Sequence, residues 1–213
     1  MNPKPLTTLL ICILILAGCK RTDNGDWPDE RMQSWFSYYD ITLNDLKKES
    51  KHDIPYRVSS TFTLCDDDIY LPFYIFNKDS TFAIDIDSYH LVLEKLEDGT
   101  LFSPGREVDW EVALIDLREN VRKRILFCGT PCVFEEAAFH PKGNIVVAGF
   151  IENKDGFLPA MWSVDPDQYT VSLSIAARSF NAREIDYISQ ERLKDVRFWF
   201  EDYELPDQLD IPL

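Results

Sequence analysis

The sequence has few groups that act as a base near neutral pH, and it lacks the common catalytic motifs. Its 213 residues include three histidines, His52, His90 and His140. None of them lies in a motif, and the G-x-S-x-G, H-E-x-x-H, phosphate-loop and dinucleotide-binding patterns are absent. Histidine is the side chain whose ordinary pKa suits proton transfer at neutral pH. The sequence therefore predicts no catalytic residue, no cofactor and a non-enzymatic role.

Positive charge is also scarce. Lys and Arg number 22 against 37 Asp and Glu, so the formal net charge is −15 at pH 7. Such a field repels nucleic-acid phosphates and anionic lipid headgroups, so we expect no nucleic-acid partner. A protein partner with a basic surface would be attracted. The simpler explanation of the acidity is that it keeps the protein in solution.

The apolar run near the N-terminus is too short to cross a bilayer. It extends from Leu6 to Leu16, about 11 residues, whereas a membrane-spanning helix needs about 20. One positive charge, Lys4, precedes it. This pattern is typical of a secretory signal, and it predicts that residues 1–18 are a signal peptide.

The residues that follow, Leu16-Ala17-Gly18-Cys19, resemble the lipobox of bacterial lipoproteins. The resemblance implies cleavage before Cys19, a diacylglyceryl group on its sulfur and usually a third acyl chain on the new amino terminus. Two chains already give stable membrane anchoring. An ordinary signal peptide with a chance cysteine is the alternative. Lys20 follows Cys19, a pattern similar to that of lipoproteins sorted to the outer membrane, so we expect the domain in the periplasm or at the cell surface.

Cleavage of 18 of the 213 residues would leave 195, with a formal charge of −16 because Lys4 is lost. This length suits a single domain. Residues 19–27 are polar around Asp23-Asn24-Gly25-Asp26 and predict a lipidated tether. Residues 28–213 are then one β-rich globular domain.

Helical patterns stand at both ends of this domain. Pro28-Asp29-Glu30 is a favourable helix start, and an apolar stripe with helical spacing follows it. A second short helix is predicted with Thr42 as cap and Asp45 three residues later. Near the C-terminus, residues 189–203 fit a helix, which we favour over a strand at residues 196–200. The first stripe consists of Met32, Trp35, Phe36 and Tyr39.

Between the helical patterns the apolar period is two. Residues 81–87 predict a half-buried strand with Asp85 and Asp87 on its outer face. Residues 169–175 alternate in the same manner, and residues 112–117 and 145–151 are apolar on both faces, as in central strands. Polar turn signals separate the runs, which favours an antiparallel meander. The turn signals lie at residues 97–99, 118–120, 141–144, 153–156 and 165–167.

Residues 137–149, followed by residues 161–165, resemble a β-propeller blade. In such blades an aromatic residue ends one strand, a proline and glycine turn follows, and a later strand ends in aspartate. Residues 110–117 and 122–127 would form the outer half of a preceding blade. The resemblance covers about a third of the predicted mature chain, and no 40-residue repeat is present. We therefore predict a mainly β fold, an antiparallel meander with a propeller-like segment and an N-terminal and a C-terminal helix.

The cysteines leave three pairing alternatives. If Cys12 is removed and Cys19 is acylated, Cys65, Cys128 and Cys132 remain. An oxidising compartment favours disulfides. A turn can bring Cys128 and Cys132 close enough to bond, Cys65 could pair with one of them, or all three could stay reduced.

Metal binding is not predicted. The Cys-x3-Cys pair is similar to envelope copper sites, but Glu136 and Val133 stand where those sites carry histidine and proline. A zinc site has acceptable ligand types, although nothing in the sequence brings its members together, and His140 fits a structural role in a turn. The zinc candidates are Cys65, Cys128, Cys132 and His140.

Acidic and aromatic clusters allow weaker hypotheses. Asp66-Asp67-Asp68, with Asp85 and Asp87, could hold calcium, but solvated turns and an outer strand face explain them better. The aromatic residues at 35–39 and 198–200 fit a core better than a contact patch.

The sequence therefore predicts an envelope lipoprotein that serves as a non-catalytic binding or assembly module. One alternative is an immunity-type lipoprotein that neutralises a cationic toxin. Another is a thiol- or metal-dependent envelope protein that uses Cys128 and Cys132.

Overall fold

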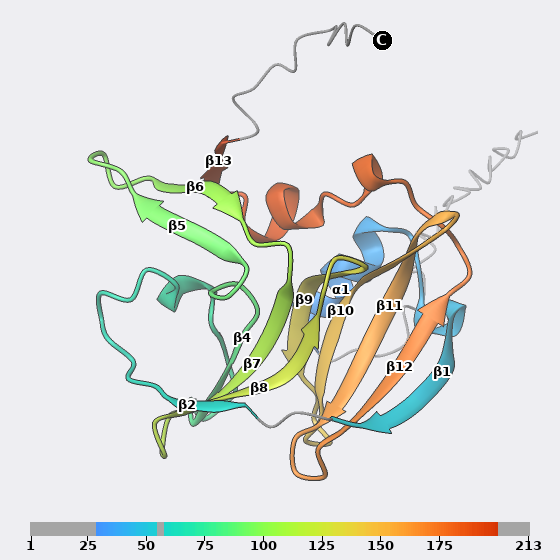
Figure 1. Cartoon of the computed structure of the whole chain (residues 1–213), viewed down its shortest axis with the longest axis horizontal. Coiled ribbons are helices and arrows are strands. Elements are labelled where there is room, and N and C mark those ends of the chain that lie inside the picture. The colour runs from blue at the N-terminus through green and yellow to red at the C-terminus, as the bar shows by residue number, and fades with distance from the viewer. Residues whose placement is uncertain (1–28, 55–57, 200–213) are drawn as a thin grey trace, which may run out of the picture.

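Three β-sheets form most of the computed structural model, which describes residues 29–54 and 58–199 (Figure 1). The predicted mainly antiparallel β fold is confirmed. Only β13 and β6 pair in parallel among the described strands. In order across each sheet, sheet A holds β1 (Leu46–Asp53), β12 (Thr170–Ala176), β11 (Gly156–Asp165), β10 (Ile145–Asn153) and β9 (Cys132–Phe139); sheet B holds β2 (Ser59–Thr61), β8 (Val121–Cys128), β7 (Trp110–Asp116), β4 (Phe82–Asp85) and β3 (Ile75–Phe76); sheet C holds β13 (Val196–Phe198), β6 (Leu101–Arg106) and β5 (Leu91–Lys95).

Strands β9 to β12 form the predicted meander. Each pairs antiparallel with the next, and β1 adds to the outer edge of β12. The turn signals of the sequence lie between successive strands, including the turn of the β7–β8 hairpin. The all-apolar runs occupy β7, the middle strand of sheet B, and β10, an inner strand of sheet A beside its edge strand β9; both are buried on both faces, apart from the last residues of β10. Continuous apolar runs in the sequence thus correctly identified the inner strands.

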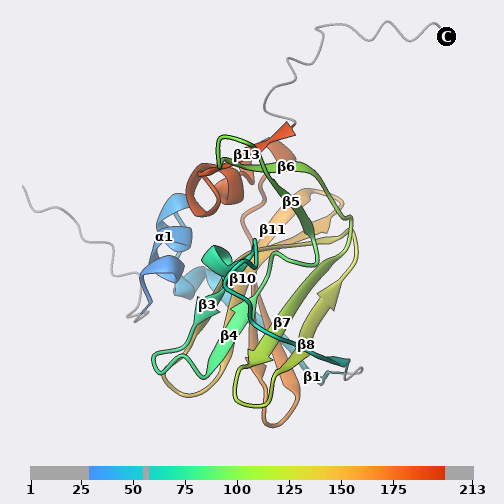
Figure 2. The same ribbon diagram turned by 90° about the vertical axis from the view of Figure 1, so that its left-hand side faces the viewer.

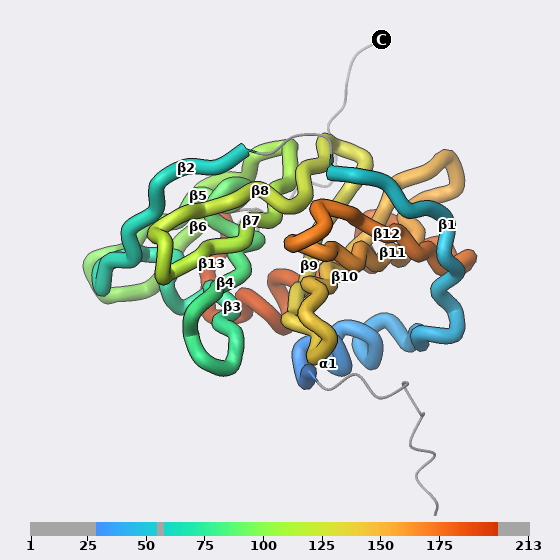
Figure 3. The backbone as a smooth tube through the Cα atoms, turned by 90° about the horizontal axis from the view of Figure 1, so that it is seen from below, coloured from blue at the N-terminus to red at the C-terminus, as the bar shows by residue number. Residues whose placement is uncertain are grey.

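Helix α1 (Glu30–Tyr38) packs against sheet A through the predicted stripe. Asp29 is its N-cap and accepts a hydrogen bond from the Arg31 backbone N–H at 2.9 Å. Figure 3 shows α1 beside β9 and β10. Pro28, part of the predicted helix start, lies outside the described residues. The buried stripe consists of Met32, Trp35, Phe36 and Tyr39.

Short helical turns connect the remaining elements. The predicted turn after α1 is the 3-10 helix η1 (Leu43–Asp45), closed by a capping box in which the Thr42 N–H donates to Asp45 at 2.7 Å. Two further 3-10 turns are η2 (Leu71–Phe73) and η3 (Ala182–Glu184), and η4 (Ile188–Arg192) is a short π-helical turn.

The main core lies between sheets A and B. Phe134 of β9 stands at its centre, with ring centroids 4.9 Å from Trp162 of β11 and 6.4 Å from Trp110 of β7. Burial of each such side chain contributes about 1.5–3 kcal/mol. A second apolar cluster holds α1 on the opposite face of sheet A. Sheet A is therefore covered on both sides.

The predicted C-terminal helix is wrong. Instead of a helix from residue 189, the chain forms η4 and then strand β13, which pairs with β6 in sheet C. Val196 and Phe198 are buried on one side of this strand, while Arg197 between them is exposed. Pairing with a partner about 95 residues away overrides a local helical pattern that was weak. Residues 200–203 of the prediction lie outside the described residues.

The predicted outer face of the strand at residues 81–87 is also wrong. β4 is buried on both faces, and Asp85 and Asp87 are only 1% and 2% exposed. A further apolar cluster that includes Tyr74 covers the side that we expected to meet water. Arginine partners make this burial tolerable, as described below.

Candidate functional site

A cleft of about 1190 Å³ opens at one end of sheets A and B. It lies among the β3–β4, β7–β8, β9–β10 and β11–β12 turns. Figure 2 shows these turns together at the lower end of the molecule. Asp29, the N-cap of α1, also lines the cleft. Its volume is somewhat above the usual range of roughly 300–1,000 Å³ for small-molecule pockets.

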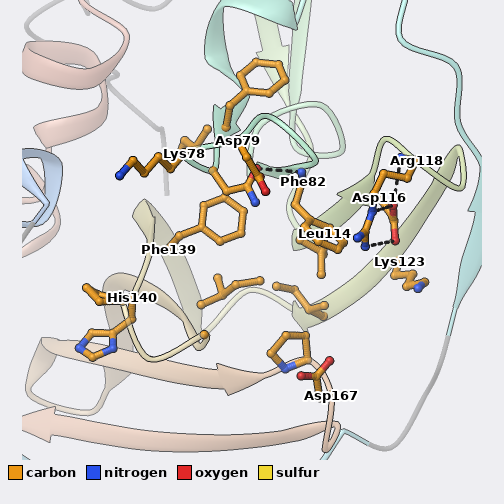
Figure 4. Close-up of a pocket in the computed structure, with 18 of the residues that line it drawn as sticks. Lys78, Asp79, Phe82, Leu114, Asp116, Arg118, Lys123, Phe139, His140 and Asp167 are labelled. Carbon is orange, nitrogen blue, oxygen red and sulfur yellow. Dashed lines mark hydrogen bonds and ion pairs between the residues drawn. The ribbon is translucent and has the colours of Figure 1, made fainter.

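The floor of the cleft is apolar. Leu114 and Ile125 of sheet B and Ile145 of sheet A are buried, with exposures of 7%, 4% and 1%. Phe82 and Phe139 are half-buried and offer ring surface to a ligand (Figure 4). These residues lie on or at the end of paired strands, so the floor is held by the sheets rather than by loops.

The rim of the cleft is charged. Arg118 lies 4.5 Å above the Phe82 ring and forms an ion pair with Asp116 at 3.3 Å (Figure 4). Burial opposes ionisation of Asp116, but the hydrogen bonds from Arg118 and from backbone N–H groups lower its pKa on balance. Acidic side chains outnumber basic ones: the acids are Asp29, Asp79, Asp116, Glu119 and Asp167, and the bases are Lys78, Arg118 and Lys123.

The three histidines lie on different elements. His140 is at the cleft rim, where its Nδ1 accepts a hydrogen bond from the Lys142 N–H at 3.2 Å, which fits a structural role in the turn. His90 is buried and stacks on Trp110 with ring centroids 3.5 Å apart. Burial lowers the pKa of His90 to about 3, so it is neutral. His52 is on the exposed strand β1.

The cysteines do not form a metal site in the described residues. Cys128 and Cys132 are joined in a disulfide with Cα atoms 5.8 Å apart, and this bond links the end of β8 to the start of β9. Cys65 is exposed. His140 follows the far end of β9, about 26 Å away for an eight-residue strand. No group of three His, Cys, Asp or Glu side chains in the described ranges is arranged to hold a metal ion.

Asp66 and Asp67 are exposed on a turn, as the solvated-turn interpretation predicted, whereas buried ion pairs hold Asp85 and Asp87. Asp85 pairs with Arg122 at 3.0 Å, and Asp87 accepts two hydrogen bonds from Arg192 at 2.6 and 2.7 Å. Asp68 accepts from the Tyr70 N–H and the Tyr74 hydroxyl, each at 2.9 Å. Donors from the protein thus satisfy the carboxylates of Asp68, Asp85 and Asp87.

Glu111 is a further buried carboxylate, and sequence reasoning missed it. It lies in β7, is 2% exposed and accepts hydrogen bonds from Arg122 and Arg124 of β8. β7 and β8 pair across a hairpin. An acidic residue in an apolar run opposite an arginine-rich strand is therefore the sequence signal that predicts this buried carboxylate.

Two adjacent buried glutamates, Glu135 and Glu136, were also missed. Each is 1% exposed. Burial is the main cause that raises both pKa values, that of Glu135 to about 7. Two consecutive acids inside the otherwise apolar strand β9 are the sequence signal for this site. Strongly shifted carboxyl groups often mark functional positions.

Comparisons with protein-family models, with curated proteins and with solved structures found no match to this chain.

The functional conclusion therefore rests on the geometry of the cleft and of the buried carboxylates. No helix in the described part of the chain has the length and apolar character needed to span a bilayer. The cleft combines an apolar floor, where the Phe82 and Phe139 rings are partly accessible, with charges of both signs, and Glu135 and Glu136 do not line it. This arrangement is suited to binding: the cleft can hold an apolar group and orient its charged neighbours.

Proposed function

We propose that the chain is a lipid-anchored envelope protein that serves as a non-catalytic binding module, with the cleft between sheets A and B as its binding site. The apolar floor and acid-rich rim of the cleft carry this proposal. The lipobox-like Leu16-Ala17-Gly18-Cys19 supports the anchor, and Lys20 supports the outer membrane as its location.

A protein segment with basic side chains is the partner that we propose. The net charge of −15 attracts such a segment from a distance. At the cleft, Glu119 and Asp167 are exposed on two turns on opposite sides of the opening and can pair with cationic side chains. Phe82 and Phe139 can receive an apolar side chain between them. An immunity-type role, in which the partner is a cationic toxin, is one form of this proposal.

The anchor restricts where this partner is met. Asp29 at the cleft rim lies ten residues after Cys19, so the chain between them spans at most roughly 35 Å. A lipid on Cys19 would keep the cleft close to the membrane surface. The partner is therefore expected at or near that membrane.

The alternative based on thiol or metal chemistry receives no support from these contacts. Both sulfurs of the Cys128 and Cys132 pair are used in the disulfide, and Cys65 is distant from them in the sequence and exposed. A structural bridge at the junction of sheets A and B is the role that we assign to the pair.

Charge reversal at the cleft tests the proposal. In the double variant Glu119→Lys, Asp167→Lys, we expect basic proteins recovered with the protein from membranes at low salt to fall about tenfold, because the attraction becomes repulsion. Quantitative mass spectrometry of the recovered proteins measures the effect. The matched control is Glu152→Lys, Asp155→Lys, which makes the same charge change at the exposed β10–β11 turn. Equal losses in both double variants, or no loss in the first, would contradict the cleft as the binding site.

A further inference from the structure

Helix α1 is held on sheet A by a buried carboxylate. The Trp35 indole N–H donates to Glu135 at 2.9 Å, and the Tyr39 hydroxyl donates to its other oxygen at 3.0 Å. Both donors belong to α1 or its C-cap, whereas Glu135 belongs to β9. We call Glu135, Trp35 and Tyr39 the clasp. Its two hydrogen bonds lie among the apolar side chains that pack α1 on sheet A.

A β-bulge directs Glu135 toward the helix. The β9–β10 register moves from Glu136 opposite Ala148 to Phe134 opposite Gly149, so Glu135 has no partner across the ladder. Such bulges redirect a side chain. Both glutamates consequently point to the side of α1 and the C-terminal segment, where Glu136 accepts from the Tyr187 hydroxyl at 3.1 Å.

The groups that face Glu135 leave its charge without an ion pair. From α1 it meets the neutral donors Trp35 and Tyr39. From the C-terminal segment, Arg192 is the cation that favours ionisation and Asp186 is an acid that opposes it. Arg192 already donates two hydrogen bonds to Asp87. Three further titratable groups pack nearby: Glu136 on β9, Tyr38 on α1, whose hydroxyl donates to Asp186 at 2.7 Å, and Tyr187, whose hydroxyl donates to Glu136 and whose N–H donates to the Tyr39 hydroxyl.

We propose that protonation of Glu135 sets how tightly helix α1 is held on sheet A. Three observations support this: the carboxyl is buried, its two donors from α1 and its C-cap are neutral, and the ion pair of Arg192 is with Asp87 and not with Glu135. A charged carboxylate without a cation is costly to bury, whereas a neutral carboxyl costs less to bury and still accepts a hydrogen bond through its carbonyl oxygen, its O–H serving as a donor. When α1 separates, Glu135 regains water and ionises readily.

The sign of the effect follows from proton linkage. The pKa of Glu135 is about 7 with α1 in place, against an ordinary value of 4.5. The state with α1 in place therefore holds the proton more tightly, and its advantage is lost as pH rises from about 4.5 to about 7. Helix α1 should be held most firmly in acid and least firmly above neutral pH.

Hydrogen exchange of the full chain, purified from membranes in detergent, tests the proposal. After correction for intrinsic exchange rates, we expect the opening constant of the α1 amides to rise on the order of tenfold between pH 5.5 and pH 8. Amides of β11 at the centre of sheet A should change less. In Glu135→Gln, the opening constant of α1 should become nearly independent of pH.

Glu136→Gln is the matched control. Glu136 is equally buried and its pKa is also raised, but its hydrogen bonds come from Tyr187 and the Ala137 N–H, not from α1. This variant should keep most of the pH dependence of α1. If it removes that dependence as fully as Glu135→Gln does, or if the native protein shows none, the proposal is wrong.

Direct titration covers the case in which Glu135→Gln does not fold. Carbon-13 NMR of the Glu135 carboxyl in the native protein should give a midpoint well above the ordinary glutamate value. Trp35→Phe keeps an aromatic ring but removes the donor, so it should raise this midpoint further. A native midpoint at or below 5 would overturn the proposal.

Discussion

His90 shows how a single buried residue imposes its own pH dependence on the fold. It stacks on Trp110, its Nδ1 contacts the Glu107 carbonyl oxygen at 2.9 Å, and its Nε2 is buried with no hydrogen-bond partner in the described residues. Burial, together with the positive charge of Arg106, lowers its pKa from 6.5 to about 3. The folded protein therefore binds this proton more weakly than the unfolded chain does.

Acid should destabilise the protein through His90. Because the folded pKa is depressed, the free energy of unfolding falls as pH falls from about 6.5 toward 3, by about 2 kcal/mol at pH 5 from this residue alone. His90→Gln should remove this loss, as measured by urea unfolding at pH 7 and pH 5. His52→Gln, on exposed β1, is the control and should behave as the native protein. If His90→Gln loses as much stability in acid as the native protein, the assignment is incorrect.

Buried charge is the feature that the sequence predicted least well at the scale of single residues. Period-two alternation placed Asp85 and Asp87 outside, yet Arg122 and Arg192, 37 and 105 residues away in the sequence, hold them inside. Alternation reports the local backbone direction only. It contains no information about which distant cation reaches a carboxylate, so these pairs appear only when the chain is folded.

At the scale of elements, the bulge in β9 depends on one glycine of the neighbouring strand. A Cβ atom at Gly149 would overlap the backbone carbonyl group of Val133 across the β9–β10 ladder. Gly149 thus permits the close approach of the two backbones at the point where the register shifts.

Substitution of this glycine should be costly. We expect Gly149→Ala to lower the free energy of unfolding by about 2 kcal/mol or more, since backbone atoms must move to admit the methyl group. Chemical denaturation measures this, and the near-ultraviolet circular dichroism of Trp35 should also change. Gly105→Ala, where a Cβ atom meets nothing within 4 Å, is the control and should cost little. Similar losses in the two variants would argue against a special role for Gly149.

Elements with strong local signals were predictable, and those that depend on distant pairing were not. The stripe of α1, the capping box of Thr42 and Asp45, the apolar runs of β7 and β10 and the polar turns are all local patterns, and the structure confirms them. Strand β13 has three residues and exists because β6 offers it an edge. The cleft likewise combines turns from two sheets, so no single segment of the sequence predicts it.

At the scale of the whole molecule, the proposed lipid anchor should determine membrane association but not the thermal stability of the folded domain. Cys19→Ser should abolish incorporation of a clickable palmitate analogue and move the protein from the membrane to the soluble fraction, because the acyl chains supply the membrane affinity. The folded domain should keep its thermal unfolding midpoint, since its core clusters are built from residues between Met32 and Phe198. Undiminished labelling or membrane retention would contradict the anchor. Cys65→Ser is the control for labelling at another cysteine.

The pairing of β1 with β12 determines when sheet A can be completed during synthesis. Strand β1 ends at Asp53, whereas its partner β12 ends at Ala176. Strand β9, on which α1 packs, is synthesised shortly before β12. At a synthesis rate of about 5–20 residues per second, synthesis of β12 is completed roughly 6 to 25 seconds after that of β1. Sheet A thus cannot assemble from the N-terminus onward as the chain emerges from the ribosome. Sheet B, whose strands all lie between residues 59 and 128, is complete in the chain before the last strand of sheet A has been made.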